Sequence, residues 1–257
     1  MAWRRVAGLG GAVLALAVLG SCVSGSGEGR GSAVSEALRA AAVEARDQKD
    51  YATAAEQYGK IFERDAADRD AAVGYLDSLR RIGAWDEART ALARGREALG
   101  DDSAFLVAAA KIQLAEGQAA QALADLDRAR GKAPRNWEIY SLTGIAYDAL
   151  NNSAAAQAAY KAGLEMAPGN PVILNNQALS LAQSGRIDEA IRILQGLLDT
   201  RQRGSPQIRQ NLAILHGFKG NLKEFEALAR GDLREDILQR NLEVFRALRA
   251  EKGTKGP

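Results

Sequence analysis

The chain has 257 residues but only one cysteine, Cys22, and one histidine, His216. A single cysteine excludes a disulfide within the chain. A single histidine leaves Ser-His-Asp, Cys-His and zinc-ligand arrangements without the residues that they need. His216 falls in an apolar helical pattern, where comparable segments place a packing residue, so we expect it to pack. The sequence therefore predicts a protein that is not an enzyme and that has no catalytic residues, no metal site and no cofactor.

The chain also lacks an excess of charge of one sign. It contains 34 basic and 32 acidic residues, and removal of residues 1–21 would take away two arginines and leave 32 of each. The uniform basic surface expected of a nucleic-acid-binding protein is therefore missing. No glycine-rich phosphate loop is found between a strand and a helix. The acidic pairs Asp86-Glu87 and Asp188-Glu189 recur at predicted helix starts, where carboxylates interact favourably with the positive end of the helix dipole. We interpret them as helix-start residues, and we expect no nucleic-acid partner.

Residues 1–21 have the features of a secretory signal peptide. Arg4 and Arg5 precede Val6–Leu19, an apolar stretch of 14 residues that is too short to span a bilayer comfortably. The stretch leads into Leu19-Gly20-Ser21-Cys22, which resembles the lipobox of bacterial lipoproteins. The resemblance implies that Cys22 carries a covalent lipid and becomes the first mature residue. The alternative is an ordinary signal peptide that contains a cysteine.

Residues 22–34 are rich in glycine and serine, a composition typical of a flexible tether. The residue directly after the cysteine is Val23 and not an aspartate. In a Gram-negative lipoprotein this implies transport to the outer membrane. We therefore expect a lipid-anchored protein on the periplasmic face of the outer membrane, with the inner membrane as the alternative.

A spacing of 34 residues runs through the rest of the chain. Five alanines recur at this spacing, each followed four residues later by tyrosine or leucine. This period is typical of stacked helical hairpins, because one hairpin alone cannot bury its apolar face. The alanines are Ala54, Ala88, Ala122, Ala156 and Ala190, and the residues that follow them are Tyr58, Leu92, Leu126, Tyr160 and Leu194. The spacing places hairpins near residues 35, 69, 103, 137 and 171.

The last part of the chain is less regular. A sixth unit begins near Pro206, its register slips by about one residue, and Phe225 or Glu224 occupies its alanine position. Apolar residues then recur at helical spacing between residues 232 and 250, as expected of an amphipathic helix that caps the last hairpin. We therefore predict about six repeats over residues 35–231, a capping helix over 232–250 and a disordered tail over 251–257.

One unit carries a family resemblance. Tyr140, Gly144, Tyr147, Ala156, Tyr160 and Pro168 fall on six of the eight signature positions of the tetratricopeptide repeat, so the unit from Trp137 to Asn170 resembles that family. The resemblance implies an all-α, right-handed superhelical solenoid. It also implies a protein that binds other proteins.

In a tetratricopeptide solenoid the first helix of each unit lines the concave face, through its positions 2, 5, 9 and 12. These positions are charged in the first two units and become apolar with interspersed amides later in the chain. Such a surface suits a peptide segment, because amides pair with its backbone while aliphatic residues contact its side chains. The alternative is that the chain's own C-terminal helix covers the aliphatic residues. The charged residues are Glu36, Arg39, Arg46, Asp70, Asp77 and Arg80. The predicted partner-binding groove contains Val107, Leu114, Ser141, Ile145, Asn175, Leu179, Gln210 and Ile214, with Val172 and Gln207 beside them.

The C-terminal half carries a narrower resemblance. The segments Asn175–Leu181, Gly185–Ile191, Arg209–Ala213 and Asn241–Leu248 resemble the TadD-type lipoprotein of tight-adherence (Flp) pilus systems. This implies a pilotin-like scaffold that assists assembly or localisation of the secretin pore, with the secretin or other pilus-assembly proteins as partners. The alternatives are a general periplasmic adaptor in envelope protein or polysaccharide export, and a regulator of cell-wall enzymes.

Overall fold

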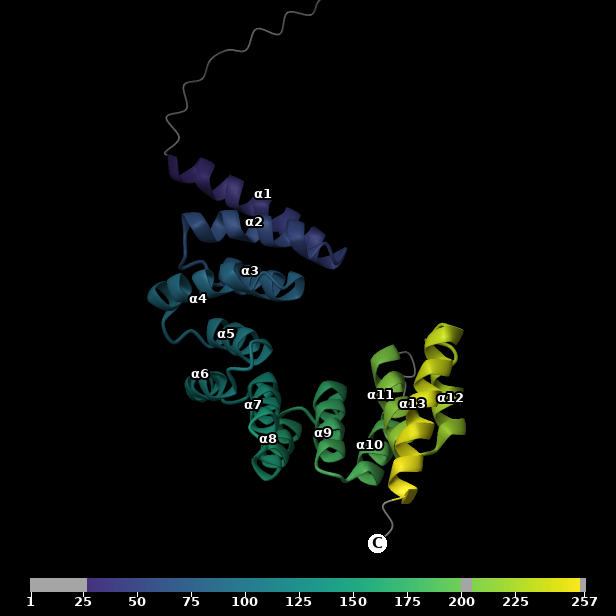
Figure 1. Cartoon of the computed structure of the whole chain (residues 1–257). Helices are drawn as coiled ribbons and strands as arrows, with labels where there is room; N and C mark the ends of the chain where they lie inside the picture. The colour runs from purple at the N-terminus through teal and green to yellow at the C-terminus, as the bar shows by residue number, and fades with distance from the viewer. Residues whose placement is uncertain (1–26, 200–204, 255–257) are drawn as a thin grey trace, which may run out of the picture.

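The computed structural model describes residues 27–199 and 205–254. These two ranges contain thirteen helices and no strand (Figure 1). The predicted signal peptide and the predicted lipid on Cys22 concern residues outside the described part. Within it, no helix combines the length and the apolar character needed to cross a membrane.

The helices form six consecutive hairpins followed by one further helix. The first helices are α1 (Gly27–Asp47), α3 (Arg69–Ile82), α5 (Ser103–Ala115), α7 (Trp137–Ala149), α9 (Pro171–Gln183) and α11 (Pro206–Lys219). The second helices are α2 (Tyr51–Arg64), α4 (Trp85–Leu99), α6 (Ala119–Lys132), α8 (Ser153–Met166), α10 (Ile187–Asp199) and α12 (Leu222–Ala229), and α13 (Glu235–Thr254) comes last. The predicted all-α superhelical solenoid with a C-terminal capping helix is confirmed.

The residues of the 34-residue period form the contacts between the helices. The five periodic alanines are completely buried, and the tyrosine or leucine four residues after each of them is also buried. Small residues are required where helices cross closely: a Cβ atom on Gly144 would lie 2.4 Å from the Tyr160 ring. The period therefore reflects packing constraints, and these residues are not available to a ligand.

The turns inside the hairpins follow the same period. One residue with positive φ occurs in each turn, at Lys49, Gly83, Gly117, Asn151 and Gly185, a spacing of 34. The sixth is Gly220, 35 residues after Gly185. This backbone conformation favours glycine or asparagine. The turn of the sixth hairpin thus shows the one-residue slip in register that the sequence predicts. Phe225 is buried at the position where the other units have their alanine.

Four of the first helices begin with a capping residue that also recurs every 34 residues. Asp68, Asp102, Asn136 and Asn170 are the N-cap residues of α3, α5, α7 and α9, and each side chain accepts a hydrogen bond from a backbone N–H of the first turn. Such a cap satisfies a donor that has no partner within the helix. The predicted helix-start acids Asp86, Glu87, Asp188 and Glu189 lie inside the first turns of α4 and α10.

The structure differs from the expectation at both ends of the repeat array. Helix α1 begins at Gly27, so residues 27–34 are helical where a flexible tether over 22–34 was predicted. Helix α13 runs to Thr254, beyond the predicted cap at 250 and into the predicted tail. In both cases a helix that tertiary packing has already formed is extended, and adding a residue to an existing helix costs far less than nucleating one.

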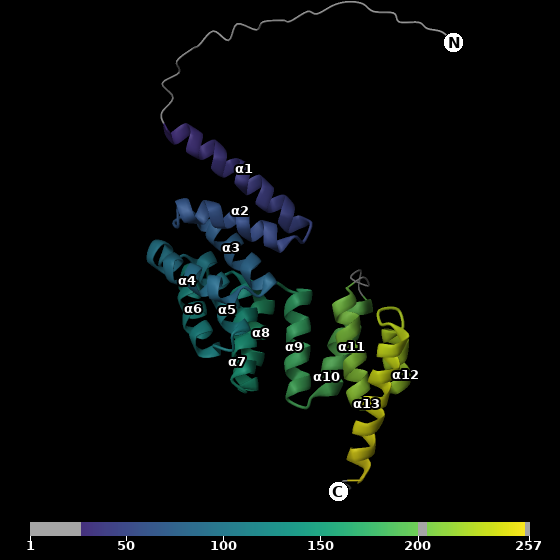
Figure 2. The ribbon, with the colours of Figure 1, turned by 45° about the horizontal axis from the view of Figure 1, so that its top comes forward.

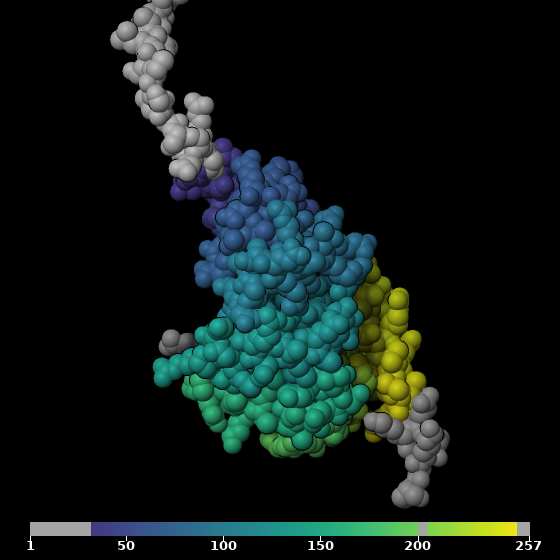
Figure 3. Space-filling model, turned by 90° about the vertical axis from the view of Figure 1, so that its left-hand side faces the viewer, coloured from purple at the N-terminus to yellow at the C-terminus, as the bar shows by residue number. Residues whose placement is uncertain are grey.

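The hairpins stack in chain order along a curve. In Figure 1, α3, α5 and α7 lie on the inner side of the curve, and α4, α6 and α8 lie on the outer side. The tilted view in Figure 2 shows α9, α11 and α13 side by side at the C-terminal end. The face seen in Figure 3 shows the successive units packed against one another without a break. The inner side therefore presents one row of first helices, and we call it the concave face.

Candidate partner-binding surface

The concave face changes chemistry along its length. At position 9 of successive first helices, the side chains are Val43, Asp77, Lys111, Ile145, Leu179 and Ile214. The row is thus charged in the second and third units and aliphatic in the last three. Two different surfaces follow from this change, one in each half of the molecule.

A cavity of about 760 Å³ lies in the N-terminal half. We call it the N-terminal cavity. Its walls come from α1, α2, α3 and α5, with one residue from α7. Five of the six charged residues predicted for this part of the groove line it, namely Arg39, Arg46, Asp70, Asp77 and Arg80. Val43, Tyr58 and Val73 supply apolar walls. The expectation that this half is charged agrees with the structure.

Exposed apolar side chains gather on the first helices of the C-terminal half. Leu179 on α9 is 38% exposed, and Ile214 on α11, at the equivalent position, is 44% exposed. Phe218 lies one turn after Ile214 and is 49% exposed, and Val172 lies two turns before Leu179. Residues at these spacings share one face of a helix. We call Val172, Leu179, Ile214 and Phe218 the apolar row.

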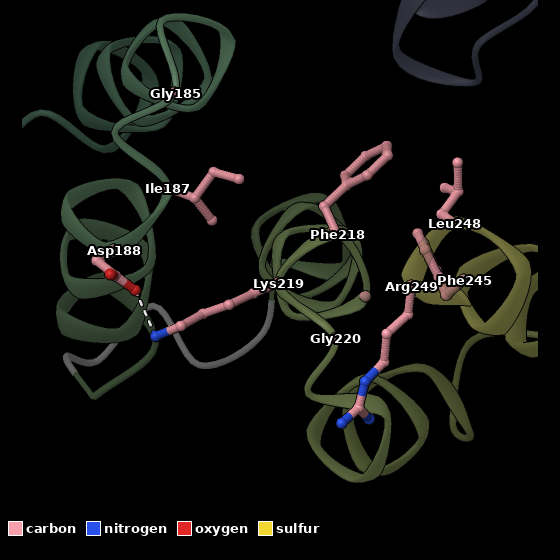
Figure 4. A pocket seen from close by; sticks show the side chains of 10 residues that line it. Gly185, Ile187, Asp188, Phe218, Lys219, Gly220, Phe245, Leu248 and Arg249 are labelled. Carbon is pink, nitrogen blue, oxygen red and sulfur yellow. Dashed lines mark ion pairs between the residues drawn. The ribbon is translucent and has the colours of Figure 1, made fainter. Parts of the chain in front are cut away.

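A pocket of about 550 Å³ lies where the apolar row ends. We call it the C-terminal pocket. Figure 4 shows Ile187 from α10, Phe218 from α11 and Leu248 from α13 around it, with the Phe245 ring beside Leu248. The Phe218 and Phe245 rings meet edge to face, with centroids 5.4 Å apart. Lys219 forms an ion pair with Asp188 on one side of the pocket, and Arg249 also lines it.

Three of the eight predicted groove residues are exposed, and they are Leu179, Gln210 and Ile214. Leu114 and Ile145 are half-buried and pack against neighbouring core residues. Val107 is buried in the wall of a small cavity of about 130 Å³. The predicted surface therefore includes three accessible side chains, and they belong to the last two units.

Ser141 and Asn175 require a correction, because both side chains are buried. Ser141 Oγ accepts a hydrogen bond of 3.1 Å from Asn176, and Asn175 Oδ1 accepts one of 2.8 Å from Asn211. The two bonds tie α7 to α9 and α9 to α11. Position 5 faces the neighbouring first helix in these units, so its polar group is used within the stack and not by a peptide. We call these two bonds the amide ladder.

Sequence reasoning missed Phe218, Phe245, Leu248 and Arg249. The signal for Phe218 was present, because it lies four residues after Ile214 on the same helix. The other three belong to α13, and their position depends on how the capping helix docks on α11. That docking includes a two-bond ion pair between Arg209 on α11 and Asp232 before α13, at 2.6 and 2.7 Å.

His216 lies in a partly buried position on α11. His216 is half-buried, its Nδ1 lies 3.3 Å from Asn221 Nδ2, and burial lowers its pKa. The position agrees with the packing role expected for it. Among the residues that the structure describes, no group of three or more His, Cys, Asp or Glu side chains is placed to hold a metal ion.

A polar cluster between α7, α8 and α9 is structural. Tyr160 Oη donates to Asp148 at 2.8 Å, Ser180 Oγ donates to the same carboxylate at 2.6 Å, and Gln157 donates to Ser180. Burial, together with the hydrogen bond to Asp148, raises the pKa of the Tyr160 hydroxyl. The hydroxyl thus remains protonated and ties α8 to α7, while Ser180 links both helices to α9.

Comparisons with known proteins agree with this architecture. The tetratricopeptide repeat family model matches residues 107–171 and again residues 142–207. No curated protein matches the chain by sequence.

Among solved structures, PilW, described as a widely conserved type IV pilus biogenesis factor, is 14% identical with a TM-score of 0.68. The match covers 82% of this chain and 97% of PilW. A thermophilic tetratricopeptide protein of Thermus thermophilus is 22% identical with a TM-score of 0.60, over 70% of this chain and all of that one. A tetratricopeptide repeat protein of Parabacteroides merdae is 15% identical with a TM-score of 0.57, over 83% of this chain and 99% of that one. At these identities the likeness is one of fold.

Proposed function

We propose that the chain, whose residues 107–207 match the tetratricopeptide repeat model, is a non-enzymatic scaffold that holds a protein partner along its concave face. The apolar row is the observation that carries this proposal. Leu179, Ile214 and Phe218 are exposed on adjacent first helices, whereas the periodic alanines and the tyrosine or leucine after each of them are buried. A monomer gains nothing from exposing such side chains together, whereas a partner that covers them removes apolar area from water.

The C-terminal pocket supports the same function. Its apolar walls, Ile187, Phe218 and Leu248, continue the apolar row toward α13. A volume of about 550 Å³ exceeds that of one side chain, so the partner enters with a bulky group or a turn of helix. A few residues held in well-packed, desolvated pockets contribute most of the binding energy at protein interfaces.

The biological setting that we propose is assembly of the Flp pilus. A lipid on Cys22 would hold the chain at the periplasmic face of the outer membrane, and the repeats would position the secretin or another pilus-assembly protein. Support comes from the TadD-like segments, which include part of the apolar row and the docked cap. PilW provides an example of this fold in a pilus biogenesis factor. A general periplasmic adaptor, or a regulator of cell-wall enzymes, would use the same surface.

The proposal is tested by crosslinking in membranes, followed by purification and mass spectrometry. Wild type is compared with Cys22→Ala, with the double variant Leu179→Asp and Ile214→Asp, and with Met166→Asp. Met166 is the matched control, because it is 42% exposed at the end of an outer helix, α8. We expect wild type and Met166→Asp to recover the secretin, the double variant to lose it, and Cys22→Ala to recover less.

The other outcomes separate the alternatives. Recovery of other envelope proteins, with the same dependence on Leu179 and Ile214, would support an adaptor and reject the pilus assignment. Recovery that is unaffected by the double variant would reject the concave face as the binding surface.

A further inference from the structure

The N-terminal cavity contains more cationic than anionic side chains. Six basic residues and three carboxylates line it. Asp70, Asp77 and Glu138 are the carboxylates, and the basic residues are Arg39, Arg46, Arg69, Arg80, Arg81 and Lys111. A cavity with one predominant sign of charge and low-dielectric walls attracts groups of the opposite sign.

Several of these cations are paired inside the protein. Arg39 binds Asp68, the N-cap of α3, with two hydrogen bonds, the shorter of 2.5 Å. Lys111 pairs with Glu138 at 2.7 Å, and Arg69 pairs with its neighbour Asp70 at 3.1 Å. These three side chains have their charge satisfied locally.

Arg80 and Arg81 are not fully compensated, because they share one carboxylate. Asp77 Oδ1 accepts a hydrogen bond of 2.6 Å from Arg80, and Asp77 Oδ2 lies 3.7 Å from Arg81 Nε. The Nε–H of Arg80 is buried and has no hydrogen-bond partner in the described part of the chain. Leaving a buried donor unpaired costs free energy.

Arg46 lies at position 12 of the first unit, which is the position that Arg80 occupies in the second unit. It lines the same cavity, its hydrogen bonds go to the adjacent Asp47 at 3.0 Å and 3.2 Å, and the Asp77 carboxylate also attracts it. A guanidinium presents donors in a planar fork that matches a carboxylate. Two such groups on neighbouring first helices therefore face one cavity with donors to spare.

We infer that the N-terminal cavity binds an internal acidic segment of the protein partner, whose glutamate or aspartate side chains contact Arg46 and Arg80. Val43 and Val73 also line the cavity, and they would contact apolar residues interspersed with the acidic ones. The inference rests on the proposed function, because it assigns a chemistry to one part of the segment held by the same concave face. The partner thus carries an acidic stretch for the N-terminal half and an apolar stretch for the C-terminal half.

The probe is a fluorescein-labelled peptide of alternating glutamate and leucine, with an amidated C-terminus so that only side-chain carboxylates are present. Its counterpart has glutamine in place of every glutamate. Fluorescence anisotropy with the full chain in detergent is expected to give at least tenfold tighter binding of the glutamate peptide. Raising sodium chloride from 50 to 500 mM is expected to weaken that binding several-fold.

The variants locate the binding. Arg46→Gln combined with Arg80→Gln is expected to lose at least tenfold in affinity. The matched control is Arg130→Gln, because Arg130 is a half-exposed arginine on α6 that pairs with Asp127 on its own helix and does not line the cavity. The double variant with lysine at both positions keeps the charge, so it is expected to retain salt-dependent binding even if the glutamine variant folds poorly.

Equal affinity for the two peptides, absence of binding, or equal losses in Arg130→Gln and the double variant would overturn the inference. Its failure can be distinguished from failure of the proposed function. If the native partner is still captured through Leu179 and Ile214 while the arginine variants have no effect, the scaffold function stands and the acidic segment is rejected. Competition by inorganic phosphate, with no preference for the glutamate peptide, would identify a simple anion site and would also reject it.

Discussion

The two halves of the concave face share one frame but differ in what they expose. The N-terminal half has a cavity lined by arginines and carboxylates, and the C-terminal half has exposed aliphatic and aromatic residues beside a pocket. In both halves the periodic alanines are fully buried. Packing thus constrains the residues at a few positions of each repeat. The remaining positions of the first helices can differ between repeats, so that different parts of the concave face can bind different kinds of ligand.

The halves also differ in how neighbouring hairpins are tied together. Ion pairs connect hairpins in the N-terminal half, as between Arg39 and Asp68 and between Arg96 and Asp125. Around α7 to α11 the ties are mainly the amide ladder and the polar cluster of Tyr160, Asp148 and Ser180, together with an ion pair of exposed side chains between Lys219 and Asp188. Salt and pH should therefore affect the first half more than the second.

The largest stability effect should be common to both halves, because both place a glycine against a tyrosine ring. A Cβ atom on Gly74 would lie 2.7 Å from the Tyr58 ring, and one on Gly144 would lie 2.4 Å from the Tyr160 ring. Gly74→Val and Gly144→Val should each lower the free energy of unfolding by about 1–3 kcal/mol through overpacking. Urea unfolding followed by circular dichroism measures the change.

Gly131→Ala in α6 is the control, because a Cβ atom there meets no other atom within 4 Å. It should raise stability by up to about 1 kcal/mol, since alanine is the better helix former. Equal effects at Gly131 and Gly144 would show that close helix crossing does not select these glycines.

A smaller effect should separate the halves. Tyr160→Phe removes a buried hydroxyl that donates to Asp148 and should cost about 1–2 kcal/mol. Tyr58→Phe is the equivalent change three units earlier. It should change stability little, because the Tyr58 hydroxyl forms no hydrogen bond within the described residues, and its oxygen is not among their fully buried polar atoms that lack a partner. The same unfolding assay compares the two, and an equal loss in both would remove this distinction between the halves.

A pH effect is expected in the N-terminal half. Burial raises the pKa of Asp68, but the hydrogen bonds from Arg39 and from the Ala71 N–H lower it by more, so the net pKa lies below its ordinary value. A lowered carboxyl pKa stabilises the fold above the pKa of the unfolded chain, and the contribution is lost as pH falls through the folded value. Arg39→Gln should therefore cost up to about 1 kcal/mol at pH 7 and progressively less below about pH 4. A constant difference from pH 7 to pH 2 would contradict this.

The smallest stability effect is expected in the apolar row. Leu179→Ser and Ile214→Ser replace exposed side chains, so each should change the free energy of unfolding by less than about 0.5 kcal/mol. Partner capture should fall strongly in the same variants. A large loss of stability would mean that these residues serve the fold and not the partner.

Much of the frame could be predicted from the sequence. The period of 34 residues placed the buried alanines and the one-residue slip before the sixth unit. These features depend on local constraints that recur in every unit, and repetition makes them visible in one sequence.

The surface was less predictable. Ser141 and Asn175 occupy groove positions of the repeat, but each finds a partner on the next first helix, and such a pairing depends on the distance between two helices. The C-terminal pocket depends on the docking of α13, which has no repeat to indicate its register. The start of α1 at Gly27 depends on helix extension, which glycine-rich composition does not reveal.

The central claim is that one protein partner lies along the concave face. The most direct test places a photo-crosslinking residue in the native protein at Leu179, at Val43 in the N-terminal cavity, and at Met166 on the outer side, and identifies what each captures in cells. The account predicts that the two concave positions capture the same protein and that the outer position does not. Capture of that protein from Met166 alone, or of unrelated proteins from Leu179 and Val43, would contradict it.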